Sequence, residues 1–141
     1  MGKINVGRVI LGGIVAGIVA DIFGFLVDGW LLAQRWNTEM QFLGHPALST
    51  HQIILFNLLG IVSGLVAIWI YAAIRPRFGP GVKTAIYAGL AVWVVGVLVP
   101  NASVMYVAGL FTRHLTLYTT LGGIVEVLVG TVVGAALYKE E

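Results

Sequence analysis

Hydrophobic positions in this chain form four long runs that are separated by short polar segments. The runs cover roughly residues 6–32, 52–74, 84–111 and 115–138. A helix needs about 20 mainly apolar residues to cross the hydrocarbon core of a bilayer, and each run is long enough. Strands of a membrane barrel would instead alternate polar and apolar residues in segments of about ten. The pattern predicts an all-α bundle of four transmembrane helices, in one domain that covers residues 1–141.

The composition favours a multi-pass membrane protein and excludes several classes of enzyme. Charged residues make up 10% of the chain and hydrophobic residues 59%, whereas soluble domains carry about 25% charged residues. The first run follows Lys3 and Arg8 as a secretory signal would, but it exceeds the apolar length of about 7–15 residues in such signals. We therefore expect an uncleaved first span. The chain has no cysteine, which excludes thiol catalysis, and it carries no nucleotide, hydrolase or nucleic-acid motif, so we predict no catalytic residues and no nucleic-acid partner.

The basic residues predict how the chain is oriented. Four spans place both termini on one side of the membrane, together with most lysines and arginines, and leave only Arg35 and Arg113 on the other side. Because such residues concentrate on the cytoplasmic side, we expect both termini in the cytoplasm. Residues 75–83 would form a short cytoplasmic turn, with Pro76 disfavouring helix just before it, and would make the neighbouring spans antiparallel. Residues 33–51 would form the outer loop.

Two local signals lie in the outer loop. Trp36, Phe42 and Leu43 suit a segment at the membrane interface. Ser49 followed three residues later by Gln52 is typical of a capping box at a helix start. We therefore expect the second transmembrane helix to begin next to Ser49.

Small and polar residues recur at helical spacing in every run. In the first run, Gly13, Gly17, Asp21, Gly24 and Asp28 follow each other at three or four residues, so they share one helix face. In lipid, helices associate through small residues that let backbones approach, and through polar contacts. We expect the small faces to point inward or toward a partner. The predicted helix-packing glycines are Gly13, Gly17, Gly24, Gly60, Gly64, Gly96, Gly130 and Gly134.

Polar residues within the runs predict a layered interior. Asp21 and Glu126 both fall near the middle of the membrane, and no basic residue of the spans accompanies them. A charged Asp at a helix centre costs about 2.5–3.5 kcal/mol, so we expect at least one of the two acids to be protonated and to donate a hydrogen bond. Either they form a proton or cation site, or they form a neutral bond between helices. A polar cap nearer the outer surface is predicted from Asp28, Asn57, Asn101 and His51.

Two further features have alternative interpretations. Pro100 would kink the third helix and free a carbonyl of the kind that can serve an ion site, although such kinks are common in membrane helices. Haem, pigment or metal ligation by His45, His51 and His114 is chemically reasonable, but these residues lack close local spacing. We predict no metal and no cofactor apart from bound lipid.

A short internal similarity relates the two halves of the chain. The first and third runs open with a basic residue and then glycine, and the second and fourth end in "IYAAIR" and "ALYK". Such parallel repeats can be related by an axis along the membrane normal. Either the chain consists of two related helical hairpins, or the similarity only reflects features that membrane helices share.

The stretch "YAAIRPRFGPGVKTA" at residues 71–85, with the "AGLAVW" that follows, resembles a group of small bacterial four-helix integral membrane proteins. The resemblance covers most of the chain. It implies a four-span fold in a bacterial inner membrane and assigns no activity or site residues. Asp21 is also similar to the single first-span acid of small multidrug transporters, but Glu126 and the long outer loop depart from that plan.

Two functions remain open on this basis. The chain would be an accessory subunit that packs against other membrane subunits or against itself, because it has little mass outside the membrane. Alternatively, it would act as an oligomeric carrier or channel for a small solute, coupled to protons or cations through Asp21 and Glu126. Glycine faces that point outward would favour the first function, and a water-filled cavity at the two acids would favour the second.

Overall fold

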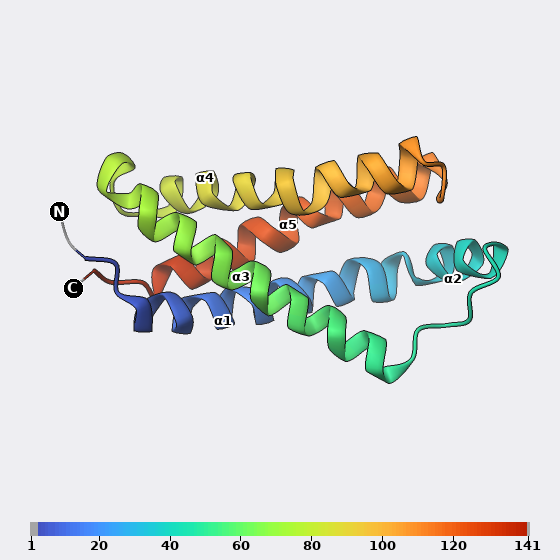
Figure 1. Ribbon diagram of the computed structural model, residues 1–141, viewed down its shortest axis with the longest axis horizontal. Coiled ribbons are helices and arrows are strands. Elements are labelled where there is room, and N and C mark those ends of the chain that lie inside the picture. Colours follow the sequence, from blue (N-terminus) through green and yellow to red (C-terminus); the bar gives the residue numbers. More distant parts are fainter. Residues whose placement is uncertain (1–2, 141) are drawn as a thin grey trace.

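The computed structural model describes residues 3–140, and this part of the chain is helical without strands. It contains α1 (Val6–Gly24), η1 (Phe25–Leu31), α2 (Ala33–Phe42), α3 (Thr50–Phe78), α4 (Val82–Trp93), η2 (Val94–Leu98), η3 (Asn101–Val107) and α5 (Arg113–Ala136). The η segments are π-helices that continue the first and third spans. Figure 1 shows an elongated bundle in which α1, α3, α4 and α5 run along the long axis. The predicted all-α class is confirmed.

Four helices are long and apolar enough to cross a membrane, as the hydrophobic pattern predicts. They cover Val6–Leu31, Thr50–Phe78, Val82–Val107 and Arg113–Ala136. Their bounds differ from the predicted runs by a few residues. These four candidate spans, found among residues 3–140, indicate a membrane protein.

The turn between α3 and α4 is shorter than the predicted segment 75–83. The helix continues past Pro76 to Phe78, and the reversal takes place at Gly79 and Gly81, which have φ angles of +82° and +120°. Only glycine adopts such angles without strain. The expectation that Pro76 would end the helix just before it is wrong, because α3 keeps its backbone bond from Gly79 N–H to Arg75 O at 2.8 Å.

The loop between the first and second spans, predicted to be the outer loop, holds a helix of its own, and the predicted cap of α3 is present. The short helix α2 contains Trp36 and Phe42 of the expected interfacial segment, and Leu43 is its C-cap. The Ser49 side chain accepts from Gln52 N–H, and Gln52 Oε1 accepts from Ser49 N–H at 2.9 Å, which completes the capping box. The predicted cap at Ser49 is confirmed, and α3 begins at Thr50, two residues before the predicted run 52–74.

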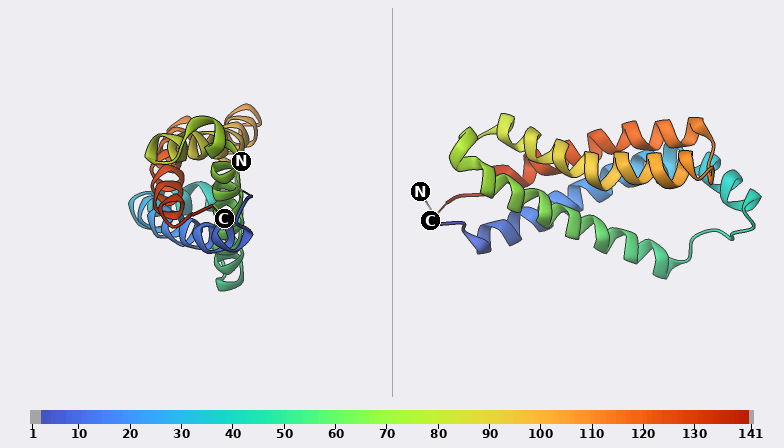
Figure 2. Two further views of the ribbon diagram at one scale, coloured as in Figure 1. Left: turned by 90° about the vertical axis from the view of Figure 1, so that its left-hand side faces the viewer. Right: turned by 45° about the horizontal axis from the view of Figure 1, so that its top comes forward.

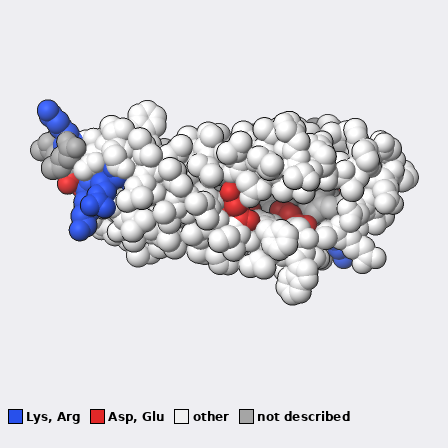
Figure 3. Space-filling view, turned by 90° about the horizontal axis from the view of Figure 1, so that it is seen from below, with Lys and Arg blue, Asp and Glu red and all other residues white. Residues whose placement is uncertain are grey.

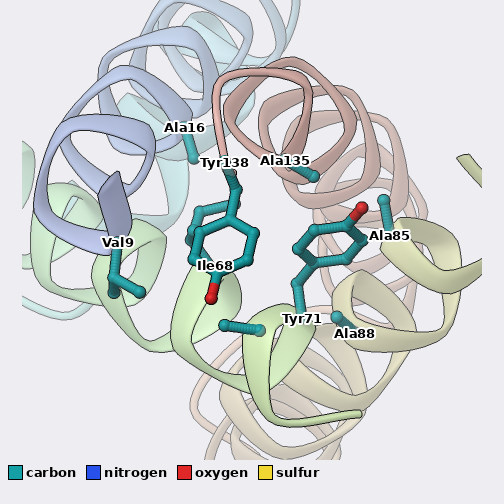
Figure 4. Close-up of a cluster of buried hydrophobic side chains, with 9 residues drawn as sticks. Val9, Ala16, Ile68, Tyr71, Ala85, Ala88, Ala135 and Tyr138 are labelled. Carbon is teal, nitrogen blue, oxygen red and sulfur yellow. The ribbon is translucent and has the colours of Figure 1, made fainter. Parts of the chain in front are cut away.

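The first and last described residues lie together at one end of the bundle, which we call the closed end (Figures 1 and 2). Here Asn5 N–H donates to the Tyr138 hydroxyl at 3.3 Å. The rings of Tyr71 and Tyr138 meet edge to face, with 5.9 Å between centroids. Figure 4 shows these rings among small and branched side chains from α1, α3, α4 and α5. The buried cluster comprises Val9, Ala16, Ile68, Tyr71, Ala72, Ala85, Ala88, Ala135 and Tyr138.

The opposite end of α3 leaves the bundle. Residues 50–59, which we call the splayed segment, are all exposed, and Figure 1 shows this part of α3 diverging from α1. By contrast, the same helix is buried at Gly64, Ala67, Ile68 and Tyr71. One helix therefore packs at the closed end and stands apart at the other.

Candidate functional site

The contacts between α1 and α3 depend on glycine. A methyl group on Gly13 would lie 2.6 Å from Leu65 Cα, and one on Gly17 would overlap the backbone of Ile61. From the other side, a methyl group on Gly64 would overlap the backbone of Gly13 and Gly17. Three glycines on two helices thus let the backbones touch, as small residues do between membrane helices.

A second small face of α1 packs on α5. Gly134 and Gly130 approach the carbonyl oxygens of Gly12 and Ala16 so closely that a methyl group on either α5 glycine would overlap them. The single stripe of small residues predicted for the first span does not include Gly12. The adjacent pair Gly12 and Gly13 was the available signal, because neighbouring positions on a helix point toward different partners.

Gly96, predicted to be a helix-packing glycine, contacts no neighbouring helix within residues 3–140. It is exposed, and nothing lies within 4 Å of the position that its Cβ would take. The π-helical turns of η2 begin just before it, and the i→i+5 bonding of a π-helix shifts later residues around the axis. In the third span, Gly89 makes the close approach instead, against Leu128 and Thr131 of α5.

Glycines also make room for the two mid-membrane carboxyl groups. Asp21 lies directly against Gly60 of α3, where a methyl group would overlap its carboxylate. Glu126 lies over Gly24 of α1, and a Cβ on Gly24 would be 3.3 Å from Glu126 Oε2. Glu126 Oε1 is buried and has no hydrogen-bond partner within the described residues. The expected hydrogen bond from one acid to the other, or to a carbonyl, is not among the bonds found in residues 3–140.

Asp28 has different surroundings from the other two acids. Its Oδ1 accepts from Trp36 Nε1 at 3.0 Å and from Thr119 Oγ1 at 2.7 Å. These bonds join η1 to α2 and to α5, and Trp36 in turn packs edge to face on Phe111. Asp28 is therefore a structural acid that holds the outer half of the first span to its neighbours. Sequence reasoning missed Thr119.

The predicted polar cap is only partly assembled. Asn101 Nδ2 donates to Thr120 Oγ1 at 3.0 Å, and Trp93 Nε1 donates to Thr120 O at the same distance. Asn57, however, donates to Ile53 O of its own helix, and both Asn57 and His51 are exposed. The cap remains incomplete because the splayed segment carries these two residues away from α5.

π-helical turns occur in the outer half of both the first and the third span. Asp28 lies in η1, and Asn101 opens η3 directly after Pro100. Each of the two polar residues reaches α5 through a threonine, Thr119 or Thr120. π-Helical turns are rare and are frequent at functional sites, so this half of the bundle is the candidate functional region.

Charged groups are unevenly distributed over the surface. Figure 3 shows basic atoms mainly at the closed end and acidic atoms in a hollow near the middle of an otherwise uncharged face. The acidic residues in the long helices are Asp21, Asp28 and Glu126. Of these, Asp21 lies against Gly60, which directly follows the splayed segment. We call this side of the bundle the open side.

The histidines do not form a site with one another. His45, His51 and His114 are all exposed. Within residues 3–140, no three His, Asp or Glu side chains come close enough together to hold a metal ion. Bound lipid remains a prediction.

No protein-family profile, no curated protein and no solved structure matches the chain. Inferences about function therefore rest on the contacts and exposed surfaces of the chain itself.

Proposed function

We propose that the chain is an interaction subunit of a bacterial inner-membrane assembly, and that its open side receives a transmembrane helix from another subunit or a second copy. The observation that carries this proposal is the splayed segment. Residues 50–59 are exposed all round although they belong to a helix whose other half is buried. Glycine faces that point outward would favour this function, but the packing glycines of α1, α3 and α5 contact one another within the chain. The surface for a partner is therefore assigned to this segment instead.

The carboxyl groups of Asp21 and Glu126 support the proposal that a partner helix packs on the open side. Within residues 3–140, the Asp21 carboxylate takes part in no hydrogen bond found, and Glu126 Oε1 is buried without a partner. A polar group without a hydrogen bond is costly in an apolar surrounding, and polar side chains join helices across membrane interfaces. We infer a partner helix that carries a hydrogen-bond donor at the depth of Asp21.

The proposed topology has both termini in the cytoplasm and antiparallel neighbouring spans. The distribution of basic residues supports it, and so does the pairing of Gly12 with Gly134 and of Gly24 with Glu126. A cysteine at Lys3 or Glu140 should be protected from an impermeant thiol reagent in intact cells, while one at Thr38 should react. Labelling at only one of the two ends would contradict four spans.

A proton- or cation-coupled carrier is the second candidate. It is favoured by Glu126 Oε1, which is buried against Gly24 and has no hydrogen-bond partner among residues 3–140. Intramembrane acids often mark ion pathways. In that case the carboxyl groups must gain and lose a proton or a cation in each cycle.

One experiment separates the two candidates. Asp21→Asn combined with Glu126→Gln keeps the shape of both side chains and removes their titration. For an interaction subunit, we expect proteoliposomes under a pH gradient to show no proton flux with either protein. We also expect both proteins to purify in mild detergent as a complex heavier than the 15.0 kDa chain. Wild-type flux that disappears in the double variant would establish the carrier, and a 15.0 kDa monomer in native membranes would exclude the subunit.

A further inference from the structure

A polar hollow lies at the end of the bundle opposite the closed end. It has a volume of about 540 Å³ and is lined by residues of η1, α2 and the start of α5, among them Leu31, Gln34, Arg35, Glu39 and His114. Ligand sites typically measure about 300–1,000 Å³. This polar hollow is not the acidic hollow of Figure 3, because neither Asp21 nor Glu126 lines it. Its role therefore does not depend on the proposed function.

Neighbouring contacts hold the two charged groups of the hollow in place. The Glu39 carboxylate accepts from Thr112 N–H at 2.8 Å and from the Thr112 hydroxyl, which ties α2 to the start of α5. The Arg35 guanidinium lies over the Tyr118 ring, 5.3 Å from its centroid. A carboxylate offers about four acceptor positions and a guanidinium five donors. Both groups can therefore still bind a ligand.

The chemistry of the hollow matches a zwitterion. It combines one fixed cation with one fixed anion, and the Arg guanidinium suits the paired oxygens of a phosphate. The carboxylate of Glu39 suits a primary ammonium group, which donates hydrogen bonds. Gln34 and His114 add polar groups to the wall.

The position of the hollow indicates a lipid rather than a fully soluble ligand. Leu31 forms its apolar wall at the point where the first span ends. Next to it, Trp30 is 70% exposed, and tryptophan typically lies at the level of lipid headgroups. A ligand in this hollow would have its polar part among the charges and its chains along the span.

We propose that the hollow binds the headgroup of a phosphoethanolamine lipid, with the phosphate at Arg35 and the ammonium at Glu39. The probes are dihexanoyl phosphatidylethanolamine, the phosphatidylcholine and phosphatidylglycerol analogues, and soluble O-phosphoethanolamine. Binding to the full chain in maltoside detergent is measured by tryptophan fluorescence. We expect the ethanolamine lipid to bind at least fivefold more tightly than the choline lipid, whose trimethylammonium cannot donate a hydrogen bond to Glu39. The glycerol lipid, which lacks an amine, should bind as weakly as the choline lipid.

Soluble O-phosphoethanolamine distinguishes the source of the headgroup. Affinity at least tenfold below that of the ethanolamine lipid would support a lipid site. Equal affinity would contradict a lipid site. Equal binding of all three lipids would overturn the proposed chemistry.

Two variants test the assigned residues. Arg35→Gln should weaken binding of every lipid at least tenfold. Arg113→Gln is the matched control, because Arg113 is the other outer cation and does not line the hollow; it should leave binding within twofold. Glu39→Gln should abolish the preference for ethanolamine over choline. Equal losses in Arg35→Gln and Arg113→Gln would mean general attraction to phosphate and would overturn the site. If Glu39→Gln does not fold, the preference of the wild-type chain for ethanolamine decides the question alone.

Discussion

The two halves of α3 belong to one long apolar helix and pack differently. At the closed end its residues are buried among three other helices, whereas the splayed segment contacts little of the chain. The buried half carries Gly60, Gly64, Ala67 and Ala72, and the splayed segment carries bulky residues such as Phe56. In lipid, apolar character gives little drive for helices to associate, and close approach through small residues does. Helices of this chain therefore join where glycine and alanine face each other, and they separate where large side chains begin.

The largest loss of stability is expected when a large side chain replaces a packing glycine near the closed end. In Gly64→Leu the new side chain would overlap the backbone of Gly13 and Gly17, and backbone atoms of a packed helix cannot move aside. Overpacking typically costs about 1–3 kcal/mol, and we expect a loss of about 3 kcal/mol in unfolding free energy. The readout is thermal unfolding in detergent. Gly96→Leu is the control, since it faces open space, and equal losses in both would contradict the rule.

A smaller loss is expected from the polar contact that holds the outer half of the first span. Thr119→Val removes the hydroxyl that donates to Asp28 while keeping the shape of the side chain. A lost hydrogen bond typically costs about 0.5–1.5 kcal/mol. Because Asp28 Oδ1 is half-buried and keeps its bond from Trp36, the unfolding free energy should fall by about 1.5 kcal/mol. Thr131→Val is the control, because that hydroxyl bonds only to Val127 O of its own helix. A stable Thr119→Val protein would show that Asp28 does not need α5.

The smallest effect is expected at the free end of α3. Ser49→Ala removes the capping box at the start of the splayed segment, and such a change costs about 1 kcal/mol. Because this segment has little packing to support it, we expect faster amide exchange in its first turns and an almost unchanged melting temperature. Ser103→Ala, whose hydroxyl bonds to Val99 O, should leave that exchange unaltered. Unchanged exchange in Ser49→Ala would mean that something else holds this end.

Local signals in the sequence were sufficient for much of the fold. Runs of apolar residues gave the four long helices, and Ser49 with Gln52 gave the start of α3. These features depend on length, composition and nearby residues. Glycine spacing also indicated close approach at Gly17 and Gly130, because few other residues permit it.

Features that depend on more than one helix were not predictable in the same way. A register shift in η2 moves Gly96 away from α5, and a 3.6-residue period does not indicate it. The bond from Thr119 to Asp28 joins residues far apart in the chain. The splayed segment separates from the bundle, which leaves Asn57 and His51 outside the polar cap. This separation depends on whether its side chains pack better against other helices or against lipid.

The central claim is that the splayed segment is a contact surface for another transmembrane helix, and a photo-reactive residue tests it most directly. Phe56 is 62% exposed in this segment, and Val95 is 73% exposed on the third span. With p-benzoylphenylalanine placed at each position in turn, irradiation of native membranes should give one discrete protein adduct from position 56 and none from position 95. A differently tagged second copy of the chain will show whether that adduct is a homo-oligomer. Adducts of equal yield at both positions, or none at position 56, would contradict the claim.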